Sequence, residues 1–578
     1  MNKTASSRLY AFLCVCSLIV CAVIAHPVAE MGIDDDGSYV KSAQVLAQTG
    51  HIVYNGWATA MLGWQLYLGA IFAQLFGFSF TAIRASTLLV ALFTVFLMHR
   101  TMVRAGINTR NATIGTLVIA LSPLFLPLAF TFMTDIGGLF CLVLCLYACL
   151  RALQARTNRA ALAWLAFAAV SNAVGGTVRQ IAWLGVLVMF PCTVWLLRRR
   201  PSALLTGSLL YVASGLFIFA SMRWFSHQPY SVGEPLLPGQ IDRQHLVHLG
   251  TRCIRASFDV AMFLLPILIA FLPALSLRNR LTSALLVLGG MLGLAGGFVL
   301  YHRHKLTTVL APYIGPYVTP RGLIDGAPLK GIRPTVLMPD VRLVLTVLIL
   351  LGLLGCLTFL ISGERQRALP NEARESVSWQ GLLILILPVS AAYIGLLLPR
   401  GAFGEIFDRY LLPLLLFCAI LLLRFFQDRV RPNLPLITCV FVLIFAAYGV
   451  AGTHDAFSMY RGRIAAVAEL RQAGIPDTSI DGGFEHNGVT QIERFGHIND
   501  HRIKIPADAY ISEFPSFPEH CAPFMGPETR AIIPGYALSF DPMSCGGPSR
   551  FSPVTYHNWL GEHSVNLYIV NTVKGVSP

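Results

Sequence analysis

The chain has 578 residues, of which 55% are apolar and only 12% are charged, and its mean hydropathy is +0.64. This composition excludes a soluble globular domain and predicts an α-helical polytopic membrane protein. The formal net charge of +14 does not indicate nucleic-acid binding, because the arginines stand in short clusters between apolar segments, where they orient helices.

Apolar runs close to the length that crosses about 30 Å of hydrocarbon predict about thirteen transmembrane helices. They lie at 9–25, 80–100, 111–130, 134–153, 160–177, 179–197, 203–222, 257–276, 281–301, 341–362, 379–398, 409–427 and 433–451. The first run resembles a signal peptide. We expect it to remain as a spanning helix, because only then do the later segments orient consistently.

If the N-terminus is cytoplasmic, every short basic loop falls on the cytoplasmic side, as the positive-inside rule requires. These loops contain the arginine clusters that begin at Arg100, Arg151, Arg198, Arg278, Arg365 and Arg424. The outer side receives the acidic motifs and the polar tail. A bacterial inner membrane with an extracytoplasmic C-terminus is therefore the expected location.

The first outer loop, 26–79, holds three consecutive carboxylates, Asp34, Asp35 and Asp36. They can cap a short interfacial helix that runs to about Gln48 and ends before Gly50. Charge beside a bilayer also tends to mark a functional site, and the pattern alone favours neither interpretation. The aromatic segment 57–76 is expected to be an interfacial helix.

Residues 1–451 are thus predicted to form the membrane domain, and residues 452–578 a small extracytoplasmic α/β domain. The tail pattern predicts a helix at 460–472 and strands at 478–480, 501–505, 531–539 and 565–572. Cys521 and Cys545 are the cysteines of this polar region, which predicts one disulfide if the tail faces an oxidising compartment.

Four short motifs resemble the polyprenyl-phosphate-sugar-dependent glycosyltransferases of the GT-C superfamily, which include protein O-mannosyltransferases and lipid A aminoarabinose transferases. They are Asp35-Asp36-Gly37-Ser38-Tyr39, Phe132-Met133-Thr134-Asp135, the pair Gly77 and Arg84, and Phe407-Asp408-Arg409-Tyr410-Leu411-Leu412-Pro413. The run 480–485 is similar to bacterial members. Each motif is weak alone, and their order and sidedness make the resemblance specific.

The resemblance implies an inverting transfer of a sugar from a polyprenyl-phosphate carrier to a hydroxyl acceptor, which can be a glycan, a lipid or a protein. Such chemistry needs a carboxylate base, and Asp35 is the candidate, with Asp36 orienting it and Asp34 as a cap. Tyr39 can hold the acceptor or simply be an interfacial aromatic. Asp135 is the second candidate carboxylate, or else a helix cap. Two facing carboxylates can hold a divalent cation, and the sequence does not decide whether Asp35 and Asp135 do so.

Arg409 is the candidate ligand of the carrier phosphate, because its guanidinium offers a fork of donors that matches phosphate oxygens. Asp408 is expected to position Arg409, and Tyr410 to anchor the mouth of the helix. A helix-end arginine that snorkels to the surface is the alternative. Arg84 and Arg179 are weaker candidates for the same phosphate, or else form internal ion pairs. The His302-Arg303-His304-Lys305 cluster can serve the carrier, but anionic lipid headgroups are favoured.

Two other classes of function remain. A transporter or flippase of lipid-linked sugars would use charged groups near helix ends for ion coupling or gating. Against this, the acids lie in outer loops and not at mid-membrane. A polytopic receptor or scaffold would leave Asp35 and Asp135 unexplained.

Overall fold

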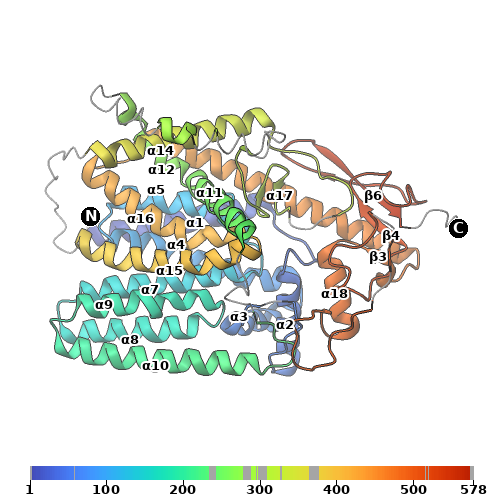
Figure 1. The fold of residues 1–578 in the computed structure, drawn as a ribbon, viewed down its shortest axis with the longest axis horizontal. Helices are drawn as coiled ribbons and strands as arrows, with labels where there is room; N and C mark the ends of the chain where they lie inside the picture. Colours follow the sequence, from blue (N-terminus) through green and yellow to red (C-terminus); the bar gives the residue numbers. More distant parts are fainter. Residues whose placement is uncertain are drawn as a thin grey trace.

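The computed structural model describes residues 3–57, 59–233, 242–276, 288–293, 296, 309–325, 329–362, 377–513, 516–517 and 520–572. A bundle of helices makes up most of this part of the chain, and a small β-sheet lies at one end of the bundle (Figure 1). The N-terminus lies at the opposite end, away from the sheet (Figure 1).

The α-helices of the described residues follow the chain from the bundle to the tail. They are α1 (Lys3–Ala25), α2 (Asp36–Thr49), α3 (Gly63–Phe76), α4 (Phe80–Arg104), α5 (Thr109–Ala120), α6 (Phe125–Leu128), α7 (Thr134–Leu153), α8 (Asn158–Gly175), α9 (Phe190–Leu196), α10 (Pro201–Ser226), α11 (Arg243–Phe263), α12 (Leu265–Leu268), α14 (Pro339–Ser362), α15 (Trp379–Phe403), α16 (Leu412–Arg429), α17 (Leu436–Gln472) and α18 (Phe484–Phe495). Tighter or wider turns join some of them: η1 (Gln180–Trp183), η2 (Gly185–Met189), η3 (Ile269–Ser276), η6 (Asp408–Leu411) and η7 (Asp477–Ser479).

Eight of the described helices are long and apolar enough to cross a membrane, and α11 with the segment after it makes a ninth span if the 68° bend between them is ignored. The predicted class, a multi-span helical protein, is therefore confirmed, but the count of thirteen is not. The predicted span 111–130 is broken, because α5 ends at Ala120 just before Pro123, which has no N–H to donate. The predicted span 281–301 lies largely outside the described residues.

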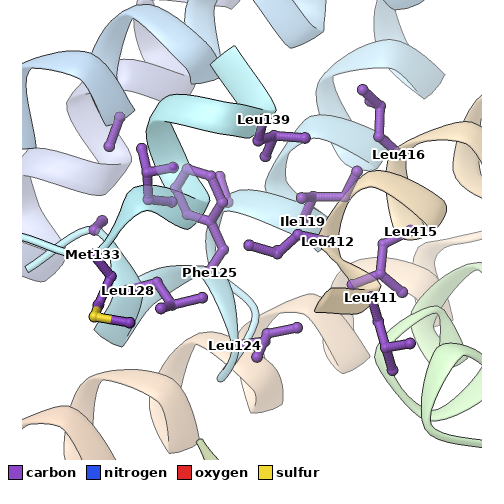
Figure 2. Packing of buried hydrophobic residues seen from close by; sticks show 14 of the residues in the cluster. Ile119, Leu124, Phe125, Leu128, Met133, Leu139, Leu411, Leu412, Leu415 and Leu416 are labelled. Atoms are coloured by element: carbon purple, nitrogen blue, oxygen red, sulfur yellow. The ribbon is translucent and has the colours of Figure 1, made fainter. Parts of the chain in front are cut away.

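A tightly packed apolar core lies where the ends of α5, α6, α7 and α16 meet (Figure 2). Phe125 and Leu416 are fully buried there, and Ile119, Leu139 and Leu412 are each 1% exposed. Lipid tails are as apolar as leucine, so close packing rather than exclusion of water holds such helices together. The core fixes the start of α7, which carries Asp135, relative to η6, which carries Arg409.

The first outer loop has the expected helices. α2 ends at Thr49, and Gly50 follows with φ 74°, a left-handed conformation that glycine adopts at low cost. The expected interfacial helix is α3, which starts six residues later than predicted, at Gly63. Figure 1 shows α2 and α3 at the end of the bundle that faces α18.

The passage from the bundle to the tail is a single helix. α17 has 37 residues, so the predicted span 433–451 and the predicted helix 460–472 are parts of one rod that reaches the sheet (Figure 1). The sheet has the order β3-β4-β6-β5, in which β3 and β4 are parallel and the other pairs are antiparallel. Its strands are β3 (Ile480–Asp481), β4 (Tyr536–Ser539), β5 (Val554–His557) and β6 (Ser564–Asn571).

Three of the four predicted tail strands overlap observed ones. The strand predicted at 501–505 is wrong, because Asp500 accepts hydrogen bonds from the backbone N–H and the guanidinium of Arg502 and holds a local turn. β5 was not predicted. It pairs with β6 from Val554 to His557, and only this partner reveals it.

The described residues 309–325 and 329–338, before α14, include the short hairpin β1 (Val318–Thr319) and β2 (Gly322–Leu323). Lys330 forms a parallel bridge with Ser539 of β4 and an ion pair with Asp481 at 3.6 Å. All thirteen cysteines are described and are free thiols. The Cys521 and Cys545 side chains contact each other, so their oxidation to a disulfide stays a prediction.

Candidate active site

Asp36 and Arg84 form a buried ion pair at the base of the first outer loop. Asp36 is fully buried and accepts two hydrogen bonds from Arg84, at 2.7 and 2.9 Å. Its remaining acceptor positions take the backbone N–H groups of Ile33 and Phe132, at 2.6 and 3.1 Å. Arg84 also donates to the carbonyls of Ala29 and Met31. Both side chains are fully hydrogen-bonded within the protein.

This geometry bears on the roles expected for the pair. Asp36 was expected to orient Asp35 or the acceptor, and Arg84 to bind the carrier phosphate or to form an internal ion pair. With every polar atom engaged and 3% or less of either side chain exposed, the pair joins the segment before α2 to α4 and to the turn before α7. Its visible task is to hold the backbone that carries Asp34 and Asp35.

Asp34 and Asp35 meet Arg409, which comes from η6 about 375 residues later in the chain. Arg409 donates through Nη1 to Asp34 and through Nη2 to Asp35, the latter at 3.1 Å. The side chain of Asp35 is 25% exposed and that of Asp34 is 14% exposed, against 6% for Arg409. Asp35 is therefore the most accessible of the three consecutive carboxylates Asp34, Asp35 and Asp36.

Two aromatic residues of the first outer loop flank Asp35. The Trp57 indole N–H donates to Asp35 Oδ1 at 3.0 Å, which leaves Oδ2 for Arg409. Tyr39 lies one turn further along α2 and is 5% exposed. Burial, reinforced by Asp35, raises the pKa of Tyr39 well above its ordinary value, so this hydroxyl stays protonated and can donate.

Asp135 and Arg179 bring a second acid and a second cation to the same neighbourhood. Asp135 lies in the first turn of α7 and pairs with Arg179 through Oδ1. The guanidinium of Arg179 stands 4.8 Å from the centre of the Tyr410 ring. Arg400 and Arg409 face the same ring at 5.0 and 5.6 Å, so three arginines surround Tyr410.

Asp408 contacts Arg409 through the backbone N–H of that residue. Its carboxylate accepts the backbone N–H groups of Tyr317, Val318 and Arg409, at 3.2, 2.7 and 2.8 Å. Asp408 thus ties η6 to the start of β1, and the Arg409 guanidinium is held by Asp34 and Asp35. Asp408 is fully buried, which suits this structural task.

The tail adds a contact that the sequence reasoning missed. Glu485 of α18 is fully buried and accepts from the backbone N–H of Asp34 at 3.3 Å and from the Tyr460 hydroxyl at 2.5 Å. Its other oxygen pairs with Arg463 at 2.8 Å. Tyr460 and Arg463 belong to α17. The run 480–485 already stood out as a resemblance, but no role for Glu485 could be read from it.

A second contact between the tail and the first outer loop is apolar. The Trp57 ring packs edge-on against Phe484 with 4.6 Å between ring centres. It also lies so close to Gly488 that a Cβ atom there would come within 2.1 Å of the ring. α18 can therefore approach Trp57 only with a glycine at this position. Through Trp57, the tail supports Asp35 as well as Asp34.

Several buried polar atoms around this cluster have no hydrogen-bond partner among the described residues. They are Nε of Arg409, Oδ2 of Asp135 and the hydroxyl of Tyr317, whose ring is 5.8 Å from the Arg409 guanidinium. A buried polar atom without a partner is costly, by about 1–3 kcal/mol. Unsatisfied donors and an unsatisfied acceptor in one place are what a polar ligand would complete.

Burial also changes the protonation of Asp34. It raises the pKa of this carboxyl to about 7, and the neighbouring Asp35, Glu485 and Asp135 act in the same direction, while Arg409 opposes them. Asp34 can therefore exchange a proton near neutral pH. Its backbone has φ 55°, an unfavourable conformation for a residue with a side chain, which the contacts with Glu485 and Arg409 hold in place.

The side chains present do not fit a divalent cation between Asp35 and Asp135. Each of these carboxylates is joined to a guanidinium, Arg409 in one case and Arg179 in the other. Within the described part of the chain, no group of three or more His, Cys, Asp or Glu has the arrangement of a metal site. The cluster His302 to Lys305 lies outside the described residues.

Comparison with known proteins gives one family match. Residues 64–225, from α3 to α10, match the family model described as dolichyl-phosphate-mannose-protein mannosyltransferase. The matched segment contains Arg84, Asp135 and Arg179. No curated protein sequence matches the chain.

Three solved structures are similar at low sequence identity. The protein O-mannosyltransferase Pmt1-Pmt2 complex of S. cerevisiae, bound to the sugar donor, is 14% identical over 38% of this chain and 33% of its own, with a TM-score of 0.31. ArnT from Cupriavidus metallidurans is 14% identical over 78% of this chain and 80% of its own, with a TM-score of 0.33. The oligosaccharyltransferase AglB from Archaeoglobus fulgidus is 17% identical over 88% of this chain and 61% of its own, with a TM-score of 0.39.

The chain thus spans a third of the yeast protein and about three fifths of the archaeal one. Over residues 64–225 it matches the dolichyl-phosphate-mannose-protein mannosyltransferase family, which confirms the resemblance to GT-C glycosyltransferases that the motifs predict.

Proposed function

We propose that the chain is an inverting glycosyltransferase that moves a sugar from a polyprenyl-phosphate carrier to a hydroxyl acceptor at the outer face of the membrane. The observation that carries this proposal is the meeting of Asp35, Arg409 and Asp135 around unsatisfied polar atoms. The match to a family named for a dolichyl-phosphate-mannose donor supports the same class of donor.

Asp35 is the proposed base. Its carboxylate takes the proton of the acceptor hydroxyl while that oxygen forms a bond to the anomeric carbon of the sugar. The bond between this carbon and the phosphate oxygen breaks, and its electron pair leaves with the carrier phosphate. One displacement of this kind inverts the configuration at the anomeric carbon. The hydrogen bond from Trp57 holds Asp35 in place without neutralising it.

Arg409 is the proposed ligand of the departing phosphate. Its Nε and the hydroxyl of Tyr317 are buried donors without a partner among the described residues, and phosphate oxygens would satisfy both. Arg179 and Arg400 lie across the Tyr410 ring and add positive charge where the phosphate gains negative charge. Asp135, through its unpartnered Oδ2, is the proposed acceptor for a hydroxyl of the sugar or of the acceptor.

The remaining assignments follow from the sidedness of the charges. We propose a bacterial inner membrane with a cytoplasmic N-terminus. In this arrangement residues 1–451 form the transmembrane domain, and residues 452–578 form an extracytoplasmic α/β domain that covers the site. The contacts of Glu485 with the Asp34 backbone and of Phe484 with Trp57 support the covering role.

The test uses Asp35→Asn, because an amide keeps the shape of the side chain but cannot take the proton. We expect sugar transfer from a polyprenyl-phosphate sugar to fall by about 10² to 10⁴. Donor binding and thermal unfolding should stay close to those of the unmodified protein. Asp508→Asn, at an exposed position of the tail, is the matched control and should transfer normally.

Two outcomes would overturn the proposal. One is normal transfer by Asp35→Asn, which would remove Asp35 from the mechanism. The other is movement of a sugar or an ion across vesicles that contain the purified protein, with no glycosylated product. The second outcome would favour a transporter.

A further inference from the structure

A cavity of about 490 Å³ opens at the end of the bundle opposite to Asp35. Four arginines line it: Arg8 of α1, Arg100 and Arg104 of α4, and Arg151 of α7. Arg84 and Arg100 are sixteen residues apart on α4, which places the cavity roughly 24 Å from the Asp36–Arg84 pair. This separation is close to the thickness of a bilayer core.

The cavity gathers positive charge without a balancing acid. Among the described residues, no Asp or Glu lines it. The contacts that hold the arginines are neutral: Arg100 donates to Ser7 Oγ at 2.7 Å, Arg104 to Gln154 Oε1 at 3.2 Å, and Arg151 lies 4.7 Å from the Trp164 ring. Like charges in a shared space repel, so an anion that enters would be stabilised.

Positive charge near the cytoplasmic ends of helices is general, and alone it would indicate only orientation. The cluster Arg198 and Arg199 illustrates that case, since both side chains are exposed and neither lines this cavity. The arginines on α1, α4 and α7 differ because they converge from three helices on one open cavity. Tyr147 adds a hydroxyl to the same wall.

The surroundings favour a lipid over a free ion. Phe96 and Leu97 give the cavity an apolar wall beside the guanidinium groups. Leu9 and Phe12 of α1, next to Arg8, are 53% and 61% exposed, so an apolar surface leads away from the cavity along the bundle. A phosphate with acyl chains could place its headgroup among the arginines and its chains along α1.

We propose that this cavity binds the phosphate of an anionic lipid headgroup, in the leaflet opposite to the Asp35 site. Guanidinium groups bind phosphate oxygens through paired hydrogen bonds, which gives the site specificity as well as charge. The proposal is independent of the transfer reaction, because no residue of the cavity belongs to the cluster around Arg409.

The experiment measures lipid retained by the full-length protein in detergent, by native mass spectrometry, after titration with phosphatidylglycerol. We expect the unmodified protein to retain the lipid. The double variant Arg100→Gln/Arg104→Gln should bind the lipid at least about tenfold more weakly, because each lost hydrogen bond between a guanidinium and the phosphate contributes substantially to the binding free energy. Arg198→Gln/Arg199→Gln, the matched control, should bind like the unmodified protein. Phosphatidylcholine, whose headgroup has no net charge, should bind weakly to all three.

Arg8→Gln is a control for loss of binding caused by misfolding, because Arg8 is exposed near the start of α1 and its substitution should leave the fold intact. This variant should also bind phosphatidylglycerol more weakly. Equal phosphatidylglycerol binding by all variants would overturn the proposal. Displacement of the lipid by millimolar inorganic phosphate would overturn the lipid assignment and leave a site for a free anion. A lack of displacement is the expected result.

Discussion

Asp35 and Asp36 are neighbours in the chain, yet the arginines they meet leave them in opposite chemical situations. Asp36 and Arg84 satisfy each other and the surrounding backbone completely and have almost no exposed surface. Asp35 and Arg409 keep a quarter of one side chain exposed and leave an Nε without a partner. Identical residue types thus form a structural clamp in one pair and an open, unsatisfied site in the other. Hydrogen-bond saturation and exposure separate the two roles, whereas charge alone does not.

The clamp should be the more sensitive of the two pairs when stability is measured. Arg84→Ala leaves a buried carboxylate without its counterion, which typically costs on the order of 3–5 kcal/mol. We expect a large fall in the thermal unfolding temperature of the purified protein in detergent. The unfolding temperature of Arg84→Lys should lie between those of the unmodified protein and Arg84→Ala, because lysine keeps the charge but loses the forked pair of hydrogen bonds. An Arg84→Ala protein as stable as the unmodified one would remove the distinction between the pairs.

Arg409→Ala should have the reverse pattern, with a large loss of function and a smaller loss of stability. Asp34 can take up a proton when its partner is gone, because burial already raises its pKa to about 7. Donor affinity and turnover should each fall by about 10- to 100-fold, the value of one or two charged hydrogen bonds. Arg409→Lys should be clearly impaired, since it loses the bidentate geometry. Donor titration and initial rates measure both effects. Destabilisation equal to that of Arg84→Ala would contradict the comparison.

Glu485→Gln asks whether the tail takes part in the site or only lies beside it. The amide keeps the shape but removes the charge that pairs with fully buried Arg463, so we expect a cost on the order of 3–5 kcal/mol. Turnover should fall more than donor affinity, because Glu485 contacts the backbone of Asp34 and not Arg409.

The matched control for this test lies on the same helix. Glu493→Gln removes an ion pair with Lys41, but Glu493 is 54% exposed, so at most about 1 kcal/mol is at stake. If the two variants had equal turnover, the tail would have no special link to the site.

The effect of Asp34 should be visible in the pH dependence of stability. Its pKa rises on folding from an ordinary 3.8 to about 7, so the folded protein holds a proton that the unfolded chain releases in this range. The stabilising contribution of Asp34 is complete below pH 3.8 and is lost as the pH rises through 7. Asp34→Asn should therefore flatten the fall of the unfolding temperature between pH 4 and pH 7. An unchanged slope would show that Asp34 titrates normally.

The sequence alone predicted many of the elements that surround the site. The glycine after α2 and the Asp-Arg-Tyr turn were recognisable because turns and helix ends depend on local residues. The expected cap by Asp34 is wrong, because the N-cap residue of α2 is Asp35, which makes no side-chain cap hydrogen bond. The apolar runs predicted a multi-span helical protein for a similar reason, since hydrocarbon thickness sets their length. Local patterns did not predict the break before Pro123 in the span 111–130 or the strand β5.

What each charged residue touches was decided only by the tertiary structure. Arg84 and Arg409 both follow from the motifs, but nothing in the local sequence says that one meets Asp36 and the other Asp34 and Asp35. Those partners lie 48 and about 375 residues away, and the packing of α4, α7 and α16 brings them together. The same holds for Glu485, which reaches Asp34 because α17 carries the tail back over the first outer loop. Sequence determined which side chains stand at helix ends, since hydropathy and local propensity act over a few residues. The structure decided which of them are saturated and which are open, since hydrogen-bond satisfaction depends on residues that are distant in the chain.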